Sequence, residues 1–458
     1  MKTKQLYLLV IFLLTPFFFN TFAQSPPGQA TLGYFNLEVE EGQQCLTDAQ
    51  RADINAMLDA NIQMLKDEGR LLYNEASKPD LVQFGWPVKT ADDVNYNQIW
   101  GTSNYVDHQS GSGLLDYFCQ QKTYNGHKGT DIYLWPFWWY AMDHFQGENI
   151  AAADGQIILK QDGNYDRRCA MGAYVWNAIY VQHADGSVAW YGHMKEGSLT
   201  SKGVGDTVVR GEFLGNVGSS GSSTGPHLHF EVYAANAALI DPFAGECNSR
   251  NDESWWDEQM SHDVPKLNAV LTHSAPPVFP ECPQQETPNL KDYFEVGEVP
   301  LLAVYLTDQQ PGSVLNLKVI RPDGSNQYDW DLELTDYYQL SYWYWSLTPD
   351  MTGNWKWQVT YQGETVTHDY FVGTMGTAES EVKNLQVFPN PANDFINLQS
   401  TEKIVKAQIF DTQGRLINNI SNASGIERMN IKSLPAGVYI LNVIDGKKNT
   451  STVKFVKK

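Results

Sequence analysis

Basic residues are scarce in this chain of 458 residues, in which 32 Lys and Arg stand against 53 Asp and Glu for a formal net charge of −21. Two lysines give the first 23 residues a charge of +2, and residues 380–458 hold 11 basic and 6 acidic residues. The negative charge therefore lies between residues 24 and 379. A surface that binds phosphate backbones needs clustered Lys and Arg, so this composition argues against a nucleic-acid partner.

Long apolar stretches are absent after the first 23 residues, so we expect no stable membrane span in the mature form. The start of the chain has the pattern of a secretory signal peptide, residues 1–23. Lys2 and Lys4 precede a mostly apolar run from Leu6 to Phe19, and Thr21-Phe22-Ala23 is a small-x-small cleavage site. The alternative is a membrane anchor, for which the run is short.

No C-x-x-C pair occurs, which argues against a zinc site built from thiolates. Export makes disulfides plausible, and an odd number of cysteines leaves at least one unpaired or shared between chains. Our expectation is that Cys119 pairs with Cys169 and Cys247 with Cys282, although the sequence alone does not assign the pairing. The five cysteines are Cys45, Cys119, Cys169, Cys247 and Cys282.

The composition is that of a folded protein, 42% hydrophobic and 13% aromatic, and the length suggests two or three domains. Short β-type runs separated by turn residues predict a mainly β fold. We expect an antiparallel β-sheet domain with a short N-terminal helical region, followed by two small immunoglobulin-like β-sandwiches. The expected boundaries are a helical region or propeptide at 24–83, the first β domain at 84–250, a Pro-rich linker at 251–288, a β-sandwich at 289–375 and a C-terminal domain at 376–458.

The helical region begins with Thr47-Asp48-Ala49-Gln50, which fits a capping box. Apolar residues then recur at helical spacing, and Gly69 marks the end. We favour a packing helix or part of a propeptide over a catalytic role. The apolar residues are Ile54, Leu58, Ile62 and Leu65.

The expected sandwich at 289–375 carries a cluster of aromatic residues. They can bind sugar or peptide, but aromatic residues in strands more often pack in the core or on the surface, and we favour packing. The cluster consists of Tyr338, Tyr342, Trp343, Tyr344 and Trp345.

Four histidines and one aspartate form the strongest chemical pattern. His227 and His229 lie two apart in a β-type run and therefore face the same side of a strand. His127 and Asp131 flank a short loop, and His193 follows a tyrosine and a glycine. A catalytic zinc site takes three His, Asp or Glu ligands plus water, so two of these side chains are left to act as general acid, general base or oxyanion stabiliser.

In this order the segments resemble the lysostaphin-type (LytM) zinc metalloendopeptidase family over residues 84–243. The motifs are H-x-G-x-D at 127–131, Y-G-H at 191–193, G-D-x-V-x-x-G at 205–211 and S-x-G-S-S-T-G-P-H-L-H-F-E at 219–231. The resemblance implies one zinc ion per chain, held by His127, Asp131 and His229. It also implies that His193 and His227 are the catalytic pair, with their individual roles left open.

The resemblance implies hydrolysis of peptide bonds, first of all in peptidoglycan cross-links or peptides. Two departures make an extracellular protein substrate more plausible: the acidic body, and a Trp-rich segment at 132–149 that we expect to form a cleft wall. The alternatives are a catalytically inactive cell-wall binding or regulatory module and a surface adhesin that uses the aromatic sandwich. The intact set of five residues favours the enzyme over the inactive module.

Other histidines are expected to have no catalytic role. His183 matches the family's strand pattern, and we interpret it as structural. The remaining ones lie outside every motif: His108, His144, His262, His273 and His368.

The C-terminal segment has a resemblance of its own. Val387-Phe388-Pro389-Asn390-Pro391-Ala392, Asp411-Thr412-Gln413-Gly414 and Leu434-Pro435-Ala436-Gly437-Val438-Tyr439 are similar to the C-terminal sorting domain of the type IX secretion system. This implies a partnership with the type IX machinery after passage through the inner membrane by the signal peptide. The product is then secreted or held at the outer-membrane surface. The alternative is a plain adhesive β-module.

Overall fold

The computed structural model describes residues 26–35, 37, 44–73, 81–92, 94–109, 111, 113–279, 285–373, 382, 384–412, 414–447 and 449–458. The expected signal peptide and Cys282 lie outside these residues. The described chain is mainly β, which confirms the fold class expected from the sequence. In this part of the chain, no helix is both long enough and apolar enough to cross a membrane.

The first long element is helix α1, Asp48–Asp67, and it begins with the expected capping box. Thr47 accepts from the backbone amide of Gln50, and the Gln50 side chain accepts from the amide of Thr47, so two otherwise free donors are satisfied. Ile54, Leu58 and Leu65 are buried. They pack on the outer face of the neighbouring sheet, in a cluster that also contains Ile158, Trp176, Tyr180 and Trp190.

The first β domain is built on an antiparallel sheet in the order β3-β4-β11-β8-β7-β6-β9, with β12 paired to β11. A smaller sheet, β10-β5-β2, packs beside it. The strands of the large sheet are β3 Trp100–Asn104, β4 Thr130–Leu134, β6 Gly155–Gln161, β7 Ala178–Gln182, β8 Val188–Gly192, β9 Thr207–Val208, β11 His227–Tyr233 and β12 Leu239–Ile240. Those of the small sheet are β2 Val88–Thr90, β5 Gly147–Ile150 and β10 Phe213–Asn216.

The sandwich that follows consists of the sheets β1-β18-β15-β13 and β14-β20-β19-β16-β17. It takes up residues from outside its expected boundaries. β13 comes from the segment expected to be a linker, and β1, from before the helix, pairs antiparallel with β18. The first sheet contains β1 Thr31–Phe35, β13 Lys266–His273, β15 Leu301–Gln309 and β18 Tyr338–Ser346. The second contains β14 Tyr293–Phe294, β16 Val314–Ile320, β17 Asn326–Glu333, β19 Gly353–Tyr361 and β20 Glu364–Val372.

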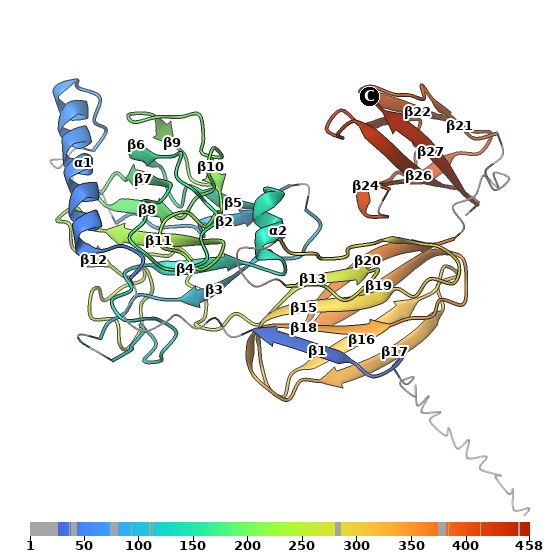
Figure 1. Cartoon of the computed structure of the whole chain (residues 1–458), viewed down its shortest axis with the longest axis horizontal. Coiled ribbons are helices and arrows are strands. Elements are labelled where there is room, and N and C mark those ends of the chain that lie inside the picture. The colour runs from blue at the N-terminus through green and yellow to red at the C-terminus, as the bar shows by residue number, and fades with distance from the viewer. Residues whose placement is uncertain are drawn as a thin grey trace, which may run out of the picture.

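The Trp-rich segment joins the two domains. Trp135 is buried against Tyr305 of the sandwich and belongs to a cluster with Tyr133, Phe137 and Leu271. It leads into the short helix α2, Trp138–Asp143, which lies where the two domains meet (Figure 1). The expectation of a cleft wall is therefore wrong for most of this segment, because its large rings fill an interdomain core.

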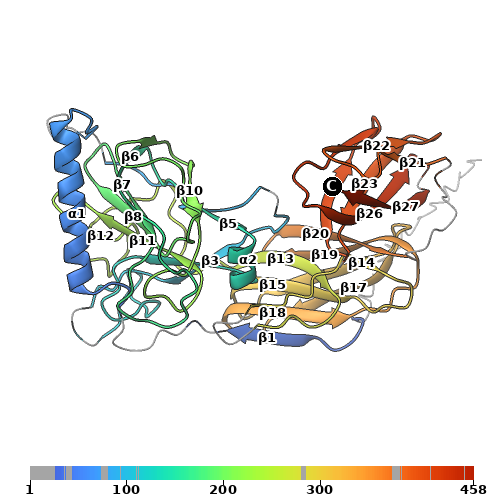
Figure 2. The same ribbon diagram turned by 45° about the horizontal axis from the view of Figure 1, so that its top comes forward.

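The C-terminal domain has two small sheets, β21-β22-β25 and β24-β23-β26-β27. It meets the sandwich through Tyr293, Phe371, Phe410 and Ile440. In Figure 2 it lies above the sandwich, next to β20. Its strands are β21 Gln386–Phe388, β22 Phe395–Gln399, β23 Ile404–Phe410, β24 Leu416–Ser421, β25 Arg428–Asn430, β26 Gly437–Asp445 and β27 Thr450–Lys457.

The disulfide pairing differs from the expected one. Cys119 is bonded to Cys247, so both expected pairs are wrong. The loop that carries Cys119 packs beside the loop after β12, where the amide of Cys247 donates to the carbonyl of Tyr117 (3.0 Å). Such a contact between loops 128 residues apart leaves no trace in cysteine spacing. Cys169 is also disulfide-bonded, whereas Cys45 is a free, buried thiol.

Candidate metal and catalytic site

Strand register brings the five candidate residues together. β11 lies between β4 and β8, and His229 is opposite Asp131 on one side and Gly192 on the other. His193 follows directly after β8, and His127 lies in the loop before β4. All five side chains therefore converge at one end of the central strand.

Three of them place ligand atoms within contact of one another. His127 Nε2 and His229 Nδ1 lie 3.1 and 2.9 Å from Asp131 Oδ1, and 3.2 Å from each other. A tetrahedral zinc ion with bonds of roughly 2.0–2.2 Å separates its ligand atoms by about 3.4 Å. Two imidazoles and a carboxylate at these separations fit a zinc ion in both chemistry and spacing.

The second nitrogen of each histidine ring is held by a partner. His127 Nδ1 donates to the carbonyl of Tyr105 (2.7 Å), His193 Nδ1 to that of Ser220 (2.6 Å) and His227 Nδ1 to that of Gly225 (2.7 Å). Partners of this kind fix the orientation of the ring and leave the other nitrogen available as a ligand or a base.

The corresponding partner of His229 is Glu231, which the sequence analysis did not single out. His229 Nε2 is 2.9 Å from Glu231 Oε2, and Glu231 also forms an ion pair with Arg51 of α1. Burial opposes ionisation of Glu231, but Arg51 and His229 outweigh it and lower its pKa to about 2. Its spacing in the sequence could have indicated this role, because Glu231 is two residues beyond His229 and therefore lies on the same face of the strand.

His193 and His227 lie beside the three candidate ligands. Their ring centroids are 4.5 Å apart, and His227 Nε2 is 3.6 Å from Asp131 Oδ1. Burial holds the pKa of His193 well below its usual value and also lowers the pKa of His227. Both rings are therefore neutral near pH 7, as a general base must be.

Two motif glycines make room for this arrangement. A β-carbon at Gly129 would come within 2.7 Å of the His229 ring, and one at Gly192 within 2.3 Å of the Trp176 ring. The next residue, His193, has a φ of 61°. Non-glycine residues seldom adopt this left-handed conformation, and they do so where the surrounding structure holds them.

A small cavity of about 130 Å³ opens onto the site, and Asp131, His227 and Trp138 are among its lining residues. Tyr133 and Trp138 are thus the residues of the Trp-rich segment that line this cavity. The side chain of His227 is 14% exposed, whereas those of His127 and His229 are 0% and that of Asp131 is 5% exposed. In this conformation the site is almost closed to solvent.

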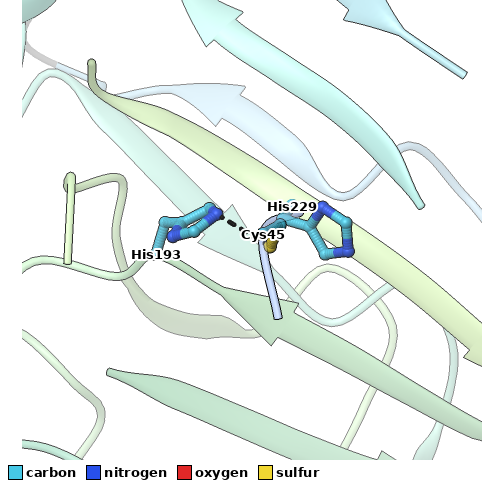
Figure 3. Close-up of side chains that lie close together, drawn as sticks. All are labelled: Cys45, His193 and His229. Carbon is cyan, nitrogen blue, oxygen red and sulfur yellow. Dashed lines mark hydrogen bonds between the residues drawn. The ribbon is translucent and has the colours of Figure 1, made fainter. Parts of the chain in front are cut away.

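The second residue that the sequence analysis did not assign to the site is Cys45. Its Sγ lies 3.3 Å from His193 Nε2, and Figure 3 shows the thiol between His193 and His229. The only feature of the sequence that pointed to Cys45 is the odd number of cysteines, which leaves at least one of them without a disulfide partner in the chain.

The other histidines lie outside the five-residue site. His183 is 1% exposed, and its Nδ1 donates to the carbonyl of Asp154 (2.8 Å). His108, His262 and His368 each pair with a carboxylate, of Asp241, Asp116 and Asp292 respectively. His144 and His273 donate to the carbonyls of Tyr140 and Pro288.

Two family models match the chain. One, described as peptidase family M23, matches residues 141–242, and the other, described as a secretion system C-terminal sorting domain, matches residues 386–458. The first match includes His193, His227 and His229, and it begins after His127 and Asp131.

The DD-carboxypeptidase/endopeptidase Mpg of Neisseria meningitidis serogroup B is 42% identical over 93 residues, which are 20% of this chain and 18% of that protein. The cell division protein DipM of Caulobacter vibrioides is 37% identical over 102 residues, which are 21% of this chain and 16% of that protein. The chain therefore matches less than a fifth of the length of these relatives.

Among solved structures, the catalytic domain of the antimicrobial peptidase lysostaphin from Staphylococcus simulans is 27% identical, with 32% of this chain and 90% of that domain covered and a TM-score of 0.21. The catalytic domain of the prophage-encoded M23 protein EnpA from Enterococcus faecalis is 24% identical, with 36% and 96% covered and a TM-score of 0.22.

Proposed function

We propose, from the premise that this chain contains a peptidase family M23 domain followed by a secretion-system sorting domain, that it is a secreted zinc metalloendopeptidase. The observation that carries the proposal is the convergence of His127, Asp131 and His229 on one point, with His193 and His227 beside them. Ligands from a loop and two strands, together with two further imidazoles, are more than a structural metal site needs.

His127, Asp131 and His229 are the proposed zinc ligands. The buried carboxylate of Glu231 orients the ring of His229 so that Nδ1 faces the metal, and the carbonyl of Tyr105 does the same for Nε2 of His127. Such outer partners are typically worth about 10–100-fold in metal affinity or activity.

A bound zinc ion supplies a water molecule with a pKa lowered to about 7 and a positive charge that polarises the scissile carbonyl. His193 and His227 supply the proton transfer and the stabilisation of the oxyanion. Both rings turn Nε2 away from their carbonyl partners, and both are neutral near pH 7. We leave open which of the two takes the proton of the water.

Peptide bonds of peptidoglycan are the proposed substrate class, as the resemblance to lysostaphin-type peptidases implies, and the Neisseria relative is likewise named a peptidase. Extracellular proteins are the second proposed substrate class. The net negative charge of residues 24–379 does not attract an anionic polymer. The sorting domain indicates delivery to the cell surface or outside, and we propose type IX export after a signal peptide as the route.

Mass spectrometry of the products tests this proposal. Mature zinc-loaded protein and an Asp131→Ala variant are incubated with purified peptidoglycan and with a protein mixture, before and after limited proteolysis of the N-terminal segment. We expect new peptide termini from peptidoglycan with the wild type and none with the variant. New peptide termini only in the protein mixture would make extracellular proteins the substrate class. The absence of new termini from both substrates would overturn the peptidase proposal in favour of a binding or regulatory module.

A further inference from the structure

Arg168 begins a segment that runs along the candidate site. Further along this segment, Met171 lines the cavity. The ring of Trp176 then contacts those of His193 and His229, with centroid distances of 5.2 and 5.7 Å. The segment from Arg168 to Trp176 therefore passes beside both the cavity and the candidate catalytic residues.

Hydrogen bonds attach Arg168 to the loop that precedes β11. Its amide donates to the carbonyl of Ser219 (3.0 Å), and Ser219 Oγ donates to the carbonyl of Arg168 (2.6 Å). Two residues further on, Ala170 forms a β-bridge with Ser223, whose Oγ lies 3.4 Å from His227 Nδ1. The backbone of Arg168 is therefore held in a fixed position relative to His227.

The guanidinium of Arg168 contacts two tyrosine rings. Its Cζ is 3.7 Å from the centroid of the Tyr174 ring and 4.9 Å from that of the Tyr165 ring. Tyr165 is 51% and Tyr174 39% exposed, so these contacts lie at the surface. Tyr174 is two residues from Trp176, and their Cα atoms therefore lie within about 7 Å of each other. The guanidinium is thus both accessible and close to the candidate site.

No carboxylate in the described part of the chain forms an ion pair with Arg168. The neighbouring Arg167 pairs with Asp143, and Asp166 pairs with Lys195 (3.6 Å). The Nε of Arg168 is buried without an acceptor among the described residues, although most buried polar groups have one. Acidic residues outnumber basic ones 53 to 32, so a shortage of acidic residues does not explain this.

We propose that Arg168 binds a carboxylate of the substrate near the scissile peptide bond, so that the enzyme selects peptides with a free carboxylate at that position. The inference rests on the proposed function. A carboxylate matches the guanidinium in charge and in shape, because two N–H groups donate in parallel to its two oxygens. The aromatic contacts hold the plane of the guanidinium, and its donors lie at the edge of that plane. Peptides carry such carboxylates at their C-terminus and on acidic side chains.

Synthetic peptides test the proposal. The sequence that the wild type cleaves, identified by mass spectrometry, is made with all carboxylates free, as a C-terminal amide, and with amides in place of its side-chain carboxylates. Zinc-loaded wild type, Arg168→Gln, Arg168→Lys and Arg167→Gln are compared by kcat and KM on each peptide. Arg167→Gln is the matched control, because it removes the same charge from a guanidinium that already pairs with Asp143.

On the peptide with free carboxylates, we expect KM to rise about tenfold or more in Arg168→Gln while kcat changes little, because a hydrogen-bonded charge pair is lost in the ground state and transition state alike. Arg168→Lys is expected to recover part of this loss, and the control to match the wild type. One of the two amide peptides is expected to give the wild type the same raised KM, with no further effect of Arg168→Gln. That peptide identifies which carboxylate Arg168 binds.

An equal KM of the wild type for free and amidated peptides would overturn the role of Arg168 and leave the proposed function intact. A rise of KM in Arg168→Gln that is the same for all three peptides would also overturn it, because a structural effect does not distinguish a carboxylate from an amide. Hydrolysis of no peptide by the wild type would overturn the proposed function and this inference with it. Melting curves show that each variant is folded, and Arg168→Lys alone decides if Arg168→Gln does not fold.

Discussion

His193 and His227 face the candidate metal position without belonging to the set of atoms that would hold an ion there. Each keeps Nδ1 on a backbone carbonyl, and the nearest approach of His227 to Asp131 is 3.6 Å, against 2.9 Å for His229. On this difference we propose that the two rings assist catalysis and do not bind the metal, and these two roles have different consequences when a ring is removed.

We predict that His193→Ala and His227→Ala keep about one zinc per chain while turnover falls by about 10²–10⁴-fold. The reason is that the rings move protons or stabilise charge and do not hold the metal. Zinc content and turnover are measured on the same preparation of each variant. Loss of zinc together with activity would make the substituted residue a ligand, and turnover within about threefold of the wild type would remove it from catalysis.

At this scale the sequence predicts the five motif residues, because each of them stands in a short pattern with its own glycine or histidine partner. It does not predict Glu231 or Cys45 as members of the site. Cys45 is 148 residues from His193 in the chain, and their contact depends on where α1 docks. No local pattern encodes a contact of that kind.

Helix α2 donates a hydrogen bond to a buried carboxylate from the segment that follows β13. The amide of Tyr140 donates to Glu286 Oε2 (2.9 Å), while burial raises the pKa of Glu286 to about 8. An ordinary glutamate has a pKa near 4.5. Below that value the side chain is neutral in both the folded and unfolded states. As the pH rises toward 8, only the unfolded state releases the proton freely, so folding becomes less favourable.

We predict that Glu286→Gln stabilises the protein at pH 8.5 relative to the wild type and has little effect at pH 4. The difference is on the order of a few kcal/mol, since a change of one in pKa corresponds to about 1.4 kcal/mol. Melting curves of both proteins across this pH range measure it. An equal shift of the melting temperature at the two ends would mean that the carboxyl is not buried as described.

Elements with strong local signals are the ones that the sequence predicts. Helix α1 has its capping box and its apolar spacing, and both are confirmed. The sequence predicts a linker where strand β13 lies, because prolines are frequent in the residues that follow it. The strand β1 lies far from β18 in the sequence, so its membership of the sandwich depends on a pairing that only the folded chain reveals.

Export is a property of the whole molecule, because the sorting domain at residues 386–458 is separate in the sequence from the candidate site at residues 127–229. We predict that deletion of residues 380–458 traps the protein in the periplasm. The control is His193→Ala with an intact C-terminus, which is expected to be exported although inactive. Immunodetection in periplasm, surface and medium distinguishes the outcomes, and normal export of the truncated protein would reduce the domain to an ordinary β-module.

The mainly β fold is predictable from the sequence because short alternating runs and turn residues recur along most of its length. The joining of the domains is not. The sequence predicts a cleft wall at 132–149, yet Trp135 of this segment lies in the core shared with the sandwich, because a buried and an exposed aromatic residue look alike in a sequence. The pairing of Cys119 with Cys247 is not predictable for a different reason, because it depends on a contact between loops 128 residues apart.

The zinc content of a His229→Ala variant is the most direct test of a zinc peptidase site at this position. The matched control is His183→Gln, which alters a buried histidine outside the site. We predict about one zinc per chain in the wild type and in the control. In His229→Ala we predict the loss of most of the zinc, and of peptide hydrolysis with it. Undiminished zinc in His229→Ala, in a protein that melts like the wild type, would contradict the account.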